Sequence, residues 1–117
     1  MTGALVDFLN ARYDEREKLA LAVAEDKRSW NTARSILNYG GHDLDEVVDW
    51  VYVDGAAEHM AANDPDSVLL DLEAKRELLK FGVAYEGSPL SDWMLRVLAQ
   101  PFASHADYLP QWAPQEA

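Results

Sequence analysis

The chain contains no cysteine among its 117 residues. A disulfide framework, a thiolate metal site and a cysteine nucleophile are therefore excluded. Long hydrophobic runs are also missing, since the apolar runs are only a few residues long and a membrane helix needs about 20. The first residues lack a basic region followed by an apolar run, so no signal peptide is predicted. We therefore expect a cytoplasmic protein without a membrane partner.

Basic residues are scarce and unevenly placed. The formal net charge is -11, and no Lys or Arg occurs between Arg34 and Lys75. That interval holds ten acids: Asp43, Asp45, Glu46, Asp49, Asp54, Glu58, Asp64, Asp66, Asp71 and Glu73. Direct binding to nucleic acid is disfavoured, because contacts to phosphate draw on Lys and Arg. The charge favours a basic protein partner, or it serves solubility alone.

Recognisable catalytic motifs are absent as well. The chain has no glycine-rich phosphate loop, no dinucleotide-binding fingerprint and no GxSxG nucleophile elbow. Its histidines are His42, His59 and His105, and none belongs to an HExxH pair. We interpret them as surface or loop residues, with His59 orienting the adjacent helix start at Asp64. The sequence thus predicts a protein that is not an enzyme and has no metal or cofactor.

Helical patterns cover most of the chain. Apolar residues at three- and four-residue spacing predict a long amphipathic helix over about residues 3–27, with the stems of Arg12 and Arg16 lying across its apolar face. A short helix is expected at 56–61. The pair Asp64-Pro65 is a start signal for a helix that we expect to end at Gly82. Ser88-Pro89 starts the last helix, which Pro101 ends.

The last helix carries the most regular apolar stripe in the sequence. Leu90, Trp93, Met94, Val97 and Leu98 lie at positions i, i+3, i+4, i+7 and i+8. The segment that follows contains Phe102, Tyr108 and Trp112 among prolines. We expect this aromatic tail to pack on the domain, because burying one such ring is worth about 1.5–3 kcal/mol.

One segment predicts a β-strand. Residues 47–53 are rich in β-branched and aromatic side chains and end at Asp54-Gly55. Residues 30–37 fit either its hairpin partner or a short helix. The predicted fold class is therefore α+β in a single domain, residues 1–117. It is helix-dominated, with a long N-terminal amphipathic helix, a small β element near 47–53, two C-terminal helices and a packed aromatic tail.

The same segment supplies the predicted partner-binding residues. If alternate residues of the strand face outward, two aromatic side chains form a contact surface rimmed by acids. The candidate residues are Asp43, Asp45, Glu46, Asp49, Trp50 and Tyr52. The alternative is a strand that is covered on both faces.

A basic spot follows the acidic interval. Lys75 and Arg76 are spaced to pair with Asp71 and Glu73, three or four residues earlier on a helix. The alternative is that the two bases form a contact patch for an anionic group.

Three blocks of the sequence resemble one family. They are residues 5–12, residues 58–76 from Glu-His-Met to Ala-Lys-Arg, and residues 95–112 with Leu-Arg-Val-Leu-Ala-Gln-Pro-Phe-Ala followed by His105, Asp107, Tyr108 and Trp112. They resemble a family of small uncharacterised proteins of actinobacteria and their phages. The resemblance implies a common origin and fold but no activity. Ala62 and Ser67 replace arginines of the family pattern, and residues 29–53 match it little.

The leading functional hypothesis is a non-enzymatic acidic interaction protein, encoded by a phage or its host, that binds a host or phage protein. One alternative is a DNA mimic, whose carboxylates imitate phosphates and block a nucleic-acid-binding enzyme. Another is a small metal-dependent hydrolase that uses His59 or His105 with nearby acids. Each hypothesis is compatible with a homo-oligomer, because the amphipathic N-terminal helix can pair with itself.

Overall fold

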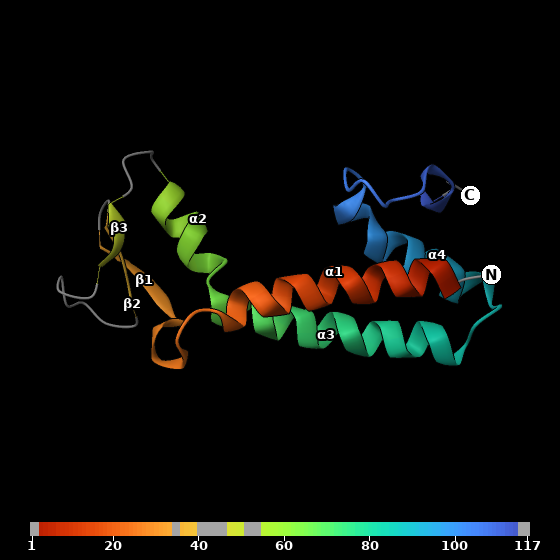
Figure 1. The fold of residues 1–117 in the computed structure, drawn as a ribbon, viewed down its shortest axis with the longest axis horizontal. Helices are drawn as coiled ribbons and strands as arrows, with labels where there is room; N and C mark the ends of the chain where they lie inside the picture. Colours follow the sequence, from red (N-terminus) through yellow and green to blue (C-terminus); the bar gives the residue numbers. More distant parts are fainter. Residues whose placement is uncertain (1–2, 34–35, 40–46, 51–54, 115–117) are drawn as a thin grey trace. The chain divides into compact units, whose positions relative to one another are not determined.

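The structure is a computed structural model that describes residues 3–33, 36–39, 47–50 and 55–114, with side chains for residues 3–30 and 55–114. Four α-helices account for most of it: α1 Gly3–Leu21, α2 Ala56–Ala62, α3 Pro65–Ala84 and α4 Pro89–Ala99 (Figure 1). Short 3-10 helices are η1 Glu25–Lys27, η3 Gln100–Phe102 and η4 Pro110–Trp112. Three short strands, β1 Trp30–Ala33, β2 Ile36–Tyr39 and β3 Val47–Trp50, lie between α1 and α2 in the sequence.

The chain divides into two compact units. Unit 1 comprises residues 1–15 and 72–117, and unit 2 comprises residues 16–71. The boundaries fall within α1 and α3. The single domain expected from the sequence stays a prediction.

In unit 1, the first part of α1 lies antiparallel to the second part of α3. Asp14 of α1 accepts a hydrogen bond of 3.0 Å from Nη2 of Arg76, and Asn10, one turn earlier on α1, shares a groove with Val83 of α3. The buried apolar side chains of α1 in this unit are Leu5, Phe8, Leu9 and Tyr13. The first three belong to the predicted apolar stripe, but Tyr13 does not, so the helical periodicity identified the buried face only in part.

The turn between α3 and α4 brings two helices of unit 1 into close contact. Ser88 begins α4 as its N-cap, and its side chain accepts a hydrogen bond from the amide of Ser91, as the Ser-Pro signal predicted. Gly82 was expected to end α3, but the helix continues to Ala84. The glycine is buried instead, and an added Cβ would lie 2.6 Å from Cδ2 of Leu95. Its role is close helix packing.

In unit 2, Asp64 joins the start of α3 to the start of β1. Its Oδ1 accepts a hydrogen bond of 2.8 Å from the amide of Ser67, and its Oδ2 accepts one of 2.8 Å from the amide of Trp30. The carboxylate is 5% exposed. The predicted N-cap is therefore confirmed, with a second bond that spans 34 residues of sequence.

Helix α1 ends earlier than the sequence predicted. It stops at Leu21 and not near residue 27, where the 3-10 helix η1 takes over. Arg28 folds back on this end, and its guanidinium donates to the carbonyl oxygens of Val23 at 2.8 Å and Leu21 at 3.2 Å. Carbonyl groups that lose their helical partners at a C-terminus are commonly satisfied in this way by a basic side chain.

The three strands form one antiparallel sheet in the order β1-β2-β3, and α2 contacts β1 and β2. Trp30 pairs with Tyr39 at one end of the β1–β2 ladder. The β2–β3 ladder carries an irregularity between Leu37 and Asn38. Each strand is only four residues long.

The α+β fold class predicted from the sequence is wrong. Of residues 3–30 and 55–114, 75% are helical, and that part of the chain contains no complete strand. Its buried hydrophobic residues all lie in helical elements: Leu5, Phe8, Leu9, Tyr13, Ala20, Ala57, Leu72, Leu79, Leu95, Ala99 and Trp112. The β-branched side chains of residues 47–53 indicate only that this segment favours an extended backbone. The fold class depends on which elements supply the buried core. The described core is helical.

No helix in the described ranges combines the length and the apolar character needed to cross a membrane.

Candidate functional site

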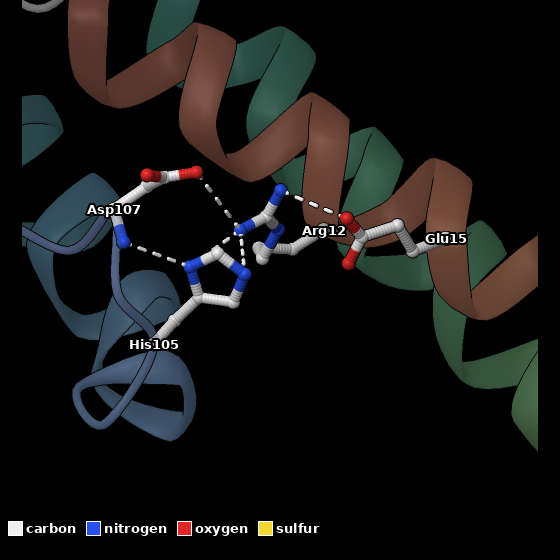
Figure 2. A network of polar contacts seen from close by, with 4 residues as sticks. All are labelled: Arg12, Glu15, His105 and Asp107. Atoms are coloured by element: carbon white, nitrogen blue, oxygen red, sulfur yellow. Dashed lines mark hydrogen bonds and ion pairs between the residues drawn. The ribbon is translucent and has the colours of Figure 1, made fainter.

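A buried arginine in unit 1 ties the C-terminal segment to α1. Arg12 is 7% exposed, and its Nη1 donates to the ring of His105, 2.6 Å from Nδ1 and also in contact with Nε2. Its Nη2 donates to Oε1 of Glu15 at 3.0 Å, and Asp107 Oδ2 lies 3.9 Å from Nη1 (Figure 2). The acids balance the charge of the guanidinium, and both are mainly exposed, at 59% and 75%.

His105 faces this cation and the chain around it. Its Nδ1 also accepts a hydrogen bond of 3.0 Å from the backbone amide of Asp107. The imidazole therefore serves as an acceptor that connects Arg12 with the loop after α4. The arrangement connects α1 with this chain segment, as Figure 2 shows.

Aromatic rings surround the same arginine. Phe8 contacts Phe102, His105, Tyr108 and Trp112 with ring centroids 5.0–6.2 Å apart. Edge-to-face and tilted pairs at such distances are favourable beyond the area that they bury. The packed aromatic tail expected from the sequence is confirmed, with Trp112 only 9% exposed.

One face of helix α4 is buried within unit 1. Ser91, Leu95 and Ala99 are buried at positions i, i+4 and i+8. Ser91 Oγ donates a hydrogen bond of 3.0 Å to the carbonyl of Gly82. The absence of a side chain at Gly82 lets α3 and α4 approach closely, with Leu95 and the end of the Met94 side chain beside the glycine.

Larger residues of α4 form an exposed apolar stripe, and we call Leu90, Trp93, Met94 and Val97 the α4 stripe. Leu90 is 63% exposed and Trp93 is 51% exposed, while Met94 and Val97 are partly exposed. These residues are four of the five in the apolar stripe that the sequence predicted for this helix, and the fifth, Leu98, is also partly exposed. The buried face of α4 is instead the one that carries Ser91, Leu95 and Ala99, and Leu95 packs against Gly82.

Further exposed apolar residues lie at the end of α3. Phe81 is 44% exposed and Tyr85, just beyond α3, is 58% exposed, and their rings are 4.6 Å apart. Leu78 and Val83 are each 46% exposed. The α3–α4 hairpin therefore presents several large hydrophobic side chains to solvent, which is typical of an interaction surface.

The partner-binding residues predicted from the sequence fall where the structure gives no side chains. Asp43, Asp45, Glu46 and Tyr52 lie outside the described residues, and Asp49 and Trp50 are described only as backbone of β3. This surface stays a prediction.

The two described histidines belong to different units. His59 is exposed on α2, and its backbone carbonyl accepts a hydrogen bond of 2.8 Å from the side chain of Asn63. His105 belongs to the Arg12 network. In the described ranges, no three His, Asp or Glu side chains are grouped so that they could hold a metal ion.

A family model matches residues 2–114. The chain belongs to the family of unknown function DUF6221. No curated protein and no solved structure matches it. The DUF6221 match covers all four helices and includes Arg12, His105 and Trp112, so the resemblance inferred from the three sequence blocks is confirmed as membership of a family without an assigned function.

Sequence reasoning missed the Arg12 network as a unit. Its available signal was a charged residue at a core position of the apolar stripe of α1, together with His105 and Asp107 in the closing block. Nothing in the spacing of residues 93 positions apart specifies that they meet. The α4 stripe was visible in the sequence, but its exposure was not.

Proposed function

We propose that this DUF6221 protein is a non-enzymatic interaction protein that binds another protein. The observation that carries the proposal is the exposure of the α4 stripe, where Leu90 and Trp93 leave more than half of their surface in contact with solvent. Large apolar side chains gathered on one helix face are a common feature of protein–protein interfaces.

The stripe has the composition of an affinity-determining contact. Trp residues are enriched among the side chains that dominate binding energies, and a neighbouring aliphatic residue completes an i, i+3 pattern that fits a groove or a second helix. Covering a side chain such as Leu90 fully is worth about 1.5–3 kcal/mol in apolar burial. The Phe81–Tyr85 pair extends the apolar surface available to a partner.

Charge supports a basic partner. The net charge of -11 and the absence of Lys and Arg between Arg34 and Lys75 attract positively charged proteins and repel nucleic acid. Within this proposal, Asp43, Asp45, Glu46, Asp49, Trp50 and Tyr52 form a second contact region. An actinobacterial host or one of its phages is the proposed origin.

Affinity capture from an actinobacterial lysate tests the proposal. The tagged protein is compared with the Leu90→Ser/Trp93→Ser variant, and retained proteins are identified by mass spectrometry. Leu19→Ser is the matched control, because Leu19 is 73% exposed on α1 in unit 2. We expect one dominant partner that the control retains and the double variant loses. Identical retention by all three proteins would contradict the role of the stripe.

The second contact region needs its own variant. Charge reversal of Asp43, Asp45, Glu46 and Asp49 should weaken capture of a basic partner and reduce its dependence on salt. Unchanged capture removes this region from the proposal. A nucleic-acid-binding enzyme as the retained partner would favour the DNA-mimic alternative.

A further inference from the structure

A groove in unit 1 combines basic and apolar side chains. It has a volume of about 360 Å³ and is lined by Asn10 of α1 and by Arg76, Leu79, Lys80, Val83 and Ala84 of α3. Ligand pockets generally begin at about 300 Å³, so the groove suits a small molecule. It involves none of the residues of the α4 stripe.

The lining residues of α3 divide the groove into two ends. Arg76 and Lys80 lie one turn apart and place two cations at one end, while Val83 and Ala84 extend an apolar wall toward the other. Val83 is 46% exposed, so this wall is in contact with solvent. Asn10, which is exposed on α1, adds an amide with both donor and acceptor groups.

The two cations already have acidic neighbours, and these neighbours are well hydrated. Arg76 Nη2 lies 3.0 Å from Asp14 Oδ1, and Lys80 Nζ lies 2.9 Å from Glu77 Oε1. Asp14 is 72% exposed and Glu77 is 68% exposed. The Lys80–Glu77 pair is exposed on both sides and contributes little, so an arriving anion meets weak competition for Lys80. The side chain of Arg76 is 29% exposed, so it is held more firmly in the groove wall.

We propose that this groove binds a small organic carboxylate with an apolar chain or ring. The carboxylate contacts Arg76 and Lys80, since a guanidinium offers paired donors that match a carboxylate and an ammonium adds a second charge. The apolar part of the ligand covers Leu79 and Val83. The two cations thus orient the ligand, with its carboxylate at their end of the groove and its apolar part at the other end.

Charge placement supports this class of ligand in an acidic protein. The chain has 10 basic residues against 21 acidic ones. Two of the few bases, Arg76 and Lys80, line the groove, and they follow within five residues of Lys75, which ends the long interval without any base. Of the two bases that the sequence offered as a contact patch for an anion, Arg76 lines the groove and Lys75 does not.

Octanoate is a suitable probe, with octanamide as the uncharged control and octylamine as the cationic control. Titration of the full chain is followed by the side-chain amide signals of Asn10 and the methyl signals of Val83 in NMR spectra. We expect saturable shifts with octanoate and at least tenfold weaker binding of octanamide and octylamine. Equal binding of the three probes, or no shift with octanoate at millimolar concentration, would overturn the proposal.

Variants locate the anion contact. Lys80→Gln and Arg76→Gln should each weaken octanoate binding about tenfold, whereas Lys75→Gln removes the same charge from α3 outside the groove and should leave binding unchanged. Lys80 is 74% exposed, so its replacement keeps the fold even if Arg76→Gln does not. A similar loss with Lys75→Gln would show a general charge effect and reject the site. The α4 variant Leu90→Ser/Trp93→Ser should bind octanoate normally.

Discussion

The guanidinium carbon of Arg12 lies 5.0 Å from the centre of the Phe8 ring, one turn away on the same helix. The contact places a buried cation over an aromatic face and leaves the acidic partners at the surface. The aliphatic stem and the planar head of Arg12 therefore act partly as packing material between α1 and the C-terminal segment.

Substitutions at Arg12 separate packing from charge. Arg12→Ala removes the side chain from the Phe8 ring and should lower the free energy of unfolding by about 2–3 kcal/mol, as for other large-to-small replacements. Arg12→Met refills much of the volume and should lose less than about 1.5 kcal/mol. Urea titration followed by tryptophan fluorescence measures both. If the two variants lose the same stability, the hydrogen bonds to His105 and Glu15 dominate.

Gly82→Ala should destabilise the protein although Gly82 is inside a helix, where alanine is ordinarily favoured by about 1 kcal/mol. The new Cβ would meet Cδ2 and Cγ of Leu95 at 2.6 and 3.0 Å, and Leu95 is fully buried. We expect a net loss of about 1–3 kcal/mol from overpacking. Gly3→Ala is the control, because a Cβ there has no neighbour within 4 Å. Thermal unfolding that leaves Gly82→Ala as stable as the control would refute the close approach.

Truncation of two leucines of α4 should change the free energy of unfolding by very different amounts. Leu95→Ala creates a cavity at a fully buried position and should cost about 2–5 kcal/mol. Leu90→Ala changes a side chain that is 63% exposed and should stay within about 0.5 kcal/mol. Chemical denaturation of both variants checks the orientation of α4. A large loss at Leu90 would mean that the stripe is covered within the chain.

Asp64→Ala should remove both the helix cap of α3 and the bond to the amide of Trp30. The loss of a cap costs about 0.5–2 kcal/mol, and a buried amide without its acceptor adds about 1–3 kcal/mol. We expect a total of about 2–4 kcal/mol. Asp66→Ala is the control, since Asp66 also lies in the first turn of α3. The amides of Ser67 and Trp30 donate to the carboxylate of Asp64 and not to that of Asp66. Hydrogen exchange at the Trp30 and Ser67 amides should quicken only in Asp64→Ala.

Local signals in the sequence predicted local structure well. The Asp64-Pro65 and Ser88-Pro89 pairs marked the starts of α3 and α4, because capping depends on residues within one turn. The buried face of α1 followed from its periodicity only in part, because Leu19 of the predicted stripe is 73% exposed and the fully buried Tyr13 was not in it. The end of α1 was placed about six residues too late, since mixed-charge residues continue the helical pattern beyond Leu21.

Contacts between distant residues could not be read in the same way. Leu95 of α4 packs against Gly82, a residue that the sequence predicted only as a helix stop. The fold class failed for a similar reason, because a short strand-like segment does not reveal which elements build the core. The candidate site rests on exposure, and exposure is a property of packing.

The contact of Arg12 with His105 spans 93 residues of the chain, which gives it a consequence for biosynthesis. A ribosome adds about 5–20 residues per second, so α1 emerges about 5–20 s before the histidine that it contacts. During that interval the Phe8 face of α1 lacks the rings that later cover it. A chaperone that binds short apolar helices would bind α1 mainly during this interval. The rate of translation between Arg12 and His105 would set how long the Phe8 face stays exposed.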